Sequence, residues 1–162
     1  MIGQYILLAL GFAAWAASLV FIFKPRWWAA PLAWLALLLL HLSYYIGVHT
    51  DTFIFWGIAA ALAAGMTYLR PNVDDATLSA SKLYIAVSAI AGCLLGMLLG
   101  ARMMVLGVIV GAFIGLMAFT RTPAGRPLRL AYSDFLYYFC AKCLPVIVTV
   151  AIDGIAIEGF IL

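Results

Sequence analysis

Charged residues are scarce in this chain of 162 residues, where aspartate, glutamate, lysine and arginine together make up 9%. A typical soluble domain contains about 25% of such residues. Hydrophobic residues make up 68% of the sequence, and its mean hydropathy is +1.18. The core of a water-soluble protein cannot hold so much apolar sequence. We therefore expect an integral membrane protein without a separate soluble domain.

The usual catalytic signatures are also missing. The sequence contains no H-E-x-x-H zinc motif, no phosphate-binding P-loop and no nucleophile elbow. Asp74 and Asp75 are the only adjacent carboxylates, and they lie in a polar stretch where solvation or helix capping accounts for them. We expect no enzymatic activity and no cofactor. The nine basic residues are too few and too scattered to indicate nucleic-acid binding.

Cysteine is rare as well. Cys93, Cys140 and Cys143 all lie in apolar segments. The spacing of Cys140 and Cys143, with Lys142 between them, matches a redox motif, but such motifs normally lie at an exposed helix N-terminus. A metal site would need at least two further ligands nearby, and the sequence offers none. We interpret the three cysteines as packing residues and expect no metal site.

The chain does contain six apolar segments, and a helix needs about 20 such residues to cross a bilayer. We predict an all-α polytopic membrane protein that forms one domain over residues 1–162 and has six transmembrane helices. Only Ala101 and Arg102 separate the fourth and fifth predicted helices, so these two must form a tight helical hairpin. The approximate spans are residues 4–23, 27–48, 53–69, 83–100, 103–119 and 135–160.

Basic residues are distributed unevenly among the connections between these spans. The second and fourth connections contain only Arg102, whereas the first, third and fifth contain seven basic residues. Because basic loops stay cytoplasmic, we expect both termini outside a bacterial inner (cytoplasmic) membrane, in the periplasm or the extracellular space. The seven residues are Lys24, Arg26, Arg70, Lys82, Arg121, Arg126 and Arg129.

Small residues recur at every fourth position in three of the predicted spans. Residues four apart lie on one helix face, and small side chains there let two helix backbones approach closely in lipid. Such faces pack helices within one subunit, form an oligomer interface, or leave a groove for a lipid or a solute. The sequence leaves these three alternatives open. The residues are Gly92, Gly96, Gly100, Gly107, Gly111, Gly115, Gly57, Ala61 and Gly65.

Three polar residues within the spans are candidates for transport or for partner contact, because ionisable groups inside a membrane are often functional. Lys142 and Asp153 lie on nearly the same face of the last helix, about 16 Å apart along its axis. Their alternative role is anchoring at the two membrane interfaces. The third candidate is His41, for which an interhelical hydrogen bond is the alternative. Pro145 is expected to kink the last helix.

The chain resembles a bacterial membrane-protein family catalogued as domain of unknown function 456. The features that carry this resemblance are Tyr68-Leu69-Arg70-Pro71, Ser81-Lys82-Leu83-Tyr84, the glycine pattern from Gly92 to Gly115, and Lys142. The turn Leu-Pro-Gly-Pro that follows the first span in that family is replaced here by the segment 24–31. The resemblance implies a glycine-zipper hairpin in a bacterial membrane. It implies no activity, because none is established for the family.

Two functions are compatible with the sequence. The small size, the several small-residue faces and the lack of a soluble domain favour a non-catalytic subunit or accessory of a larger inner-membrane complex. Its partners would be the lipid bilayer and either other membrane-protein subunits or a second copy of the chain. The alternative is a small oligomeric transporter or channel for an ion or a small solute, with Lys142, Asp153 and His41 along its path.

Overall fold

The structure is a computed structural model that describes residues 2–23, 28–44, 46–68, 75–123 and 139–161. Every regular element within these ranges is helical, so the prediction of an all-α fold is confirmed for this part of the chain. The short π-helix η2 runs directly into α8. In chain order the elements are α1 (Ile2–Phe23), α2 (Ala29–Leu42), α3 (Thr50–Tyr68), α4 (Asp75–Met97), α5 (Ala101–Thr120), η2 (Phe139–Cys143) and α8 (Leu144–Ile161).

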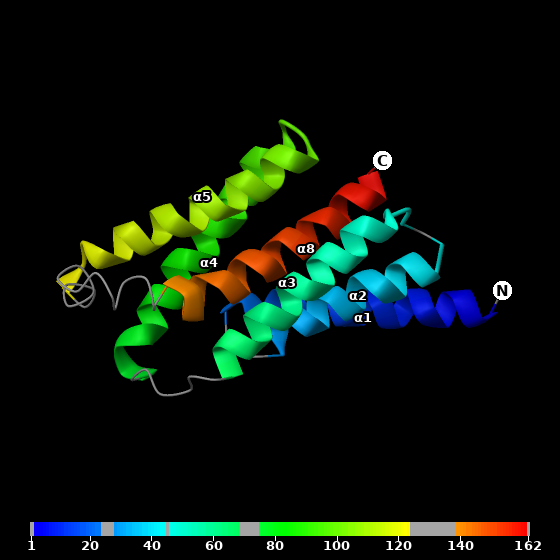
Figure 1. The fold of residues 1–162 in the computed structure, drawn as a ribbon, viewed down its shortest axis with the longest axis horizontal. Helices are drawn as coiled ribbons and strands as arrows, with labels where there is room; N and C mark the ends of the chain where they lie inside the picture. Colours follow the sequence, from blue (N-terminus) through cyan, green and yellow to red (C-terminus); the bar gives the residue numbers. More distant parts are fainter. Residues whose placement is uncertain (1, 24–27, 45, 69–74, 124–138, 162) are drawn as a thin grey trace.

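Helix α8 lies at the centre of the bundle, between α5 and α3 in Figure 1, and it contacts each of the other described α-helices, α1 to α5. A helix that is apolar on every side is stable against lipid as well as against protein, so the sequence of α8 permits this central position but does not require it. The residues from Pro145 to Gly154 are buried without a break. The α4–α5 hairpin packs on one side of α8, and α1, α2 and α3 pack on the others.

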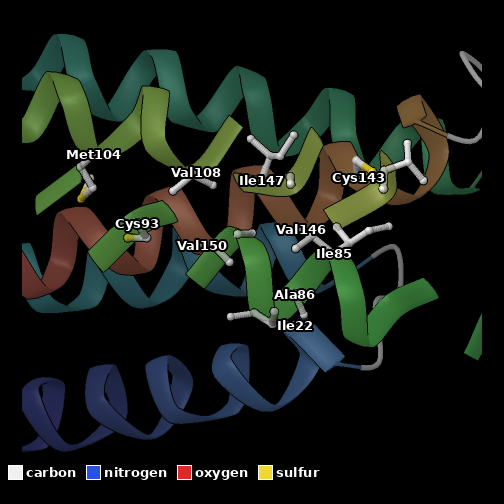
Figure 2. Close-up of a cluster of buried hydrophobic side chains, with 13 residues drawn as sticks. Ile22, Ile85, Ala86, Cys93, Met104, Val108, Cys143, Val146, Ile147 and Val150 are labelled. Atoms are coloured by element: carbon white, nitrogen blue, oxygen red, sulfur yellow. The ribbon is translucent and has the colours of Figure 1, made fainter. Parts of the chain in front are cut away.

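Two apolar clusters meet on α8. The first joins it to α4 and α5, and Figure 2 shows Cys93 of α4 and Met104 of α5 pointing toward it. The second joins it to α2 and α3 through residues such as Leu37 and Ala60. The two faces of α8 therefore pack mainly on different neighbours, and Ile22 of α1 also belongs to the first cluster.

Among the described residues, four helices are long and apolar enough to cross a membrane. They are Ile2–Phe23, Thr50–Tyr68, Arg102–Thr120 and the continuous helix Phe139–Ile161. Two further apolar helical stretches are shorter, namely α2 (Ala29–Leu42) and the part of α4 from Ser81 to Met97. These findings support a helical membrane protein, whereas the number of six crossings stays a prediction.

The predicted extent of the second span, residues 27–48, is wrong because α2 ends at Leu42. The backbone N–H of Tyr44 donates to the carbonyl oxygen of His41 at 2.9 Å, and Tyr44 has a φ of 61°, which turns the chain out of the helix. With 14 residues, α2 is about 21 Å long, shorter than the roughly 30 Å hydrocarbon layer.

The predicted position of the tight turn is also wrong by two residues. Ala101 and Arg102 are the first residues of α5, and the turn consists of residues 98–100. The reversal is possible because Gly100 has a φ of 111°, a conformation that residues with a Cβ rarely adopt. Helix α4 begins at Asp75, earlier than the predicted residue 83. The first residues predicted for the last span, 135–138, lie outside the described residues.

Candidate functional site

The glycines of the α4–α5 hairpin lie between two helix backbones that touch. A Cβ atom added at Gly92 would overlap the carbonyl oxygen of Gly107, and one added at Gly107 would overlap that of Gly92. This contact leaves no room on the face for another helix or for a lipid chain. The other glycines whose Cβ atoms would collide with the opposite backbone are Gly96, Gly111 and Gly115.

The small-residue face of α3 is open by comparison. No atom lies within 4 Å of a Cβ built at Gly65, and Ala61 is exposed. Gly57 packs against a side chain, the indole ring of Trp34, instead of against a backbone. The indole N–H of Trp34 donates to the carbonyl oxygen of Phe53 at 3.1 Å, which ties α2 to α3 at this point.

An apolar groove of about 450 Å³ lies between α2 and α3 beside this face. Both Gly57 and Ala61 line it, together with Trp34 and other apolar side chains. We call this surface, from the groove to Gly65, the α3 face. The lining residues are Pro31, Trp34, Phe53, Ile54, Gly57, Ile58, Ala60 and Ala61.

A larger cavity of about 900 Å³ opens between α3 and α5, with α8 as its floor. Its lining includes residues of the α2–α3 connection and of the start of α5. The lining of the cavity is mostly apolar. It also includes three charged or titratable side chains, those of His49, Arg102 and Glu158. These three residues come from three separate parts of the sequence.

Asp153 is buried inside the bundle where α8 meets α1, with 2% of its surface exposed. The hydroxyl oxygen of Ser18 lies 2.8 Å from Oδ1 of Asp153 and 2.7 Å from the carbonyl oxygen of Trp15. The second carboxyl oxygen, Oδ2, has no hydrogen-bond partner in the part of the chain that the structure describes. An interfacial anchor would be accessible to solvent, so this alternative does not fit Asp153.

The three predicted polar residues lie in separate places. Lys142 belongs to η2 and is half-buried, eleven residues before Asp153 on the same continuous helix. Nδ1 of His41 lies 3.0 Å from the carbonyl oxygen of Ile46, and the imidazole ring packs edge-on against Phe53. His41 thus stabilises the turn that follows α2. The described contacts do not connect these residues into one path.

Ser18 is the partner of Asp153, and the sequence pattern does not point to it. The two residues are 135 positions apart, and Ser18 is the one serine in an alanine-rich helix that contains no threonine. The one available signal is general: a polar side chain inside an apolar span needs a hydrogen-bond partner. The cavity is equally hard to foresee, because separate chain segments bring Arg102 and Glu158 to it.

Comparison with protein-family models, curated proteins and solved structures finds no match to this chain. The resemblance to domain of unknown function 456 stays a prediction.

Proposed function

We propose that this protein is a non-catalytic subunit or accessory of a larger complex in the bacterial inner membrane, and that the α3 face contacts its partner. One observation carries the proposal. The small residues of the hairpin pack against each other within the subunit, whereas Ala61 and Gly65 have no such neighbour among the described residues. The same spacing of small residues therefore occurs twice. In the hairpin it packs against a helix of the same chain, whereas at Ala61 and Gly65 no described helix packs against it.

A transmembrane helix of another subunit is the occupant that fits the α3 face. Helices gain little from hydrophobic burial inside lipid, so they associate where small residues allow close packing. The α4–α5 hairpin shows how this chain itself uses glycines for that purpose. The groove beside Gly57 and Ala61 offers room for larger side chains of the approaching helix.

Site-specific photo-crosslinking in cells tests the proposal. A photoreactive residue at Ala61 is expected to crosslink to one partner protein, whereas the same residue at Ile114, which is exposed on α5, is expected not to. Gly65→Leu is expected to release that partner during co-purification. The subunit itself should keep its abundance, since the space beside Gly65 is empty.

Three outcomes would contradict the proposal. Crosslinks from Ala61 to lipid alone would leave the α3 face as a lipid-covered surface. A crosslink to a second copy of this chain, with no other protein present, would replace the hetero-complex by a homo-oligomer. A stoichiometric partner that survives Gly65→Leu unchanged would place the contact elsewhere.

A second candidate function is a small oligomeric transporter or channel for an ion or a small solute. The cavity of about 900 Å³ favours it, because charged side chains surround a space large enough for a small solute. Purified protein in liposomes would then conduct monovalent ions, or take up a solute, and Arg102→Gln and Glu158→Gln would lower the flux. Absence of flux together with a stoichiometric partner would exclude the transporter function and support the role as a complex subunit.

A further inference from the structure

The hydroxyl group of Ser18 has two oxygen neighbours but only one proton. It lies 2.7 Å from the carbonyl oxygen of Trp15 and 2.8 Å from Oδ1 of Asp153. A serine hydroxyl donates one hydrogen bond and accepts others. If Ser18 donates to one neighbour, the second contact needs a proton from the other partner. A backbone carbonyl has no proton to give, whereas a carboxylic acid has one.

The surroundings of the carboxyl group do not suit a negative charge. Oδ2 has no hydrogen-bond partner, and Ser18 is the only hydrogen-bond partner of Oδ1 among the described residues. None of the lysine, arginine and histidine side chains that the structure describes forms an ion pair with Asp153. A buried carboxylate without a cation or several donors is strongly destabilising.

Helices α4 and α5 contribute sulfur atoms to the surroundings of this part of α8. A Cβ built at the neighbouring Gly154 would lie 2.9 Å from Sγ of Cys93 on α4 and 2.7 Å from Sδ of Met104 on α5. On the α2 and α3 side, apolar residues such as Ala151 and Ile152 join the second cluster. Cys93 is therefore the titratable neighbour that the described contacts place here.

The other titratable groups near α8 belong to different surroundings. Arg102 and Glu158 line the cavity between α3 and α5, and Asp153 is not part of that lining. His41 of α2 bonds to the α2–α3 connection. On α1, Trp15 has a buried indole Nε1 that likewise lacks a hydrogen-bond partner.

We propose that Asp153 and Ser18 form a proton-binding site inside the bundle. The bound proton lies on Oδ1 of Asp153 and is donated to Oγ of Ser18, which in turn donates its own proton to the carbonyl oxygen of Trp15. This chain of two hydrogen bonds connects α8 to α1. Loss of the proton to water leaves a carboxylate that must recruit water molecules, and this loosens the contact between α1 and α8.

Infrared spectroscopy of the full-length protein in lipid bilayers tests the proposal. At neutral pH the wild-type protein is expected to show the carbonyl stretching band of a protonated carboxylic acid. The band should disappear in Asp153→Asn, persist in Glu158→Gln as the matched carboxyl control, and shift in Ser18→Ala. Asp153→Asn should accumulate normally, since an amide N–H can replace the acid proton as the donor to Ser18.

Two results would overturn the proposal. The absence of a band that depends on Asp153 would show an ionised carboxylate at neutral pH. A band that appears only after sodium is removed would show a metal-cation site in place of a proton site. If Asp153→Asn fails to accumulate, isotope labelling of the aspartate carboxyl carbons in the wild-type protein identifies the band as that of an aspartic acid. A shift of the labelled band in Ser18→Ala then assigns it to Asp153, and an unshifted band contradicts the proposal.

Discussion

Whether a glycine in this protein tolerates a side chain depends on what it faces. Gly92 and Gly107 face each other's carbonyl groups, so the extra atom of an alanine meets a backbone that cannot rotate away. Gly65 has the same spacing pattern around it but faces empty space. Sequence spacing alone does not distinguish these positions.

The pair Gly92→Ala and Gly65→Ala measures this difference. Gly92→Ala is expected to lower the free energy of unfolding by about 1–3 kcal/mol, because overpacking forces the two helix backbones apart. Gly65→Ala should leave it nearly unchanged. Reversible unfolding in detergent or bilayers provides the measurement. Equal effects at the two positions would contradict the described contact between α4 and α5.

At the scale of elements, α4 and α5 share the most extensive contact between two of the described helices. The glycine faces of this hairpin are predictable from the sequence because the pattern is local and regular. The turn is less predictable, since Leu98, Leu99 and Gly100 look like a continuation of the apolar run. Its position is decided by one glycine whose φ of 111° reverses the chain.

Gly100→Val tests how much the hairpin depends on that glycine. A β-branched residue in this conformation, which is essentially restricted to glycine, should cost about 1–3 kcal/mol of stability. Leu99→Val, at an exposed neighbouring position, serves as the control. Both variants are compared by thermal unfolding in the same detergent. A turn that is set by the helix faces alone would show no difference between them.

The end of α2 could not be read from the sequence. The apolar run continues past Leu42, and no glycine or proline lies in residues 43–46 to indicate the turn. The structure ends the helix through the left-handed conformation of Tyr44, next to the contact between His41 and Ile46. Such an ending depends on tertiary contacts, which local propensity does not contain.

At the scale of the whole molecule, the ends of the described chain lie at one end of the bundle (Figure 1). This arrangement agrees with an even number of crossings, and the uneven distribution of basic residues favours both termini outside. Five of those basic residues lie outside the described ranges, namely Lys24, Arg26, Arg70, Arg126 and Arg129. Lys82 and Arg121 lie within them.

Cysteine labelling tests this orientation in a variant without the native cysteines. Arg121→Cys is expected to react with a membrane-impermeant maleimide only after the cells are opened, because the proposed topology places the basic end in the cytoplasm. His49→Cys, on the connection between α2 and α3, is expected to react in intact cells. Labelling of both positions from the same side would exclude the proposed topology.

The buried polar group is a property of the whole bundle and not of any segment. Asp153 is recognisable in the sequence as a charge in an apolar span, but its partner Ser18 is 135 residues away. The same holds for the cavity, whose lining comes from α3, α5, α8 and the α2–α3 connection. Only the packed structure brings such distant residues together.

The central position of α8 has a consequence for biosynthesis. A ribosome synthesises the chain from its N-terminus, so α8 is the last of the described helices to enter the membrane. Until then α1, α2, α3, α4 and α5 lack the helix that all of them contact. Before α8 enters, the surfaces of the other helices that later contact it must face lipid or an insertion factor. The bundle is therefore completed late, when α8 inserts.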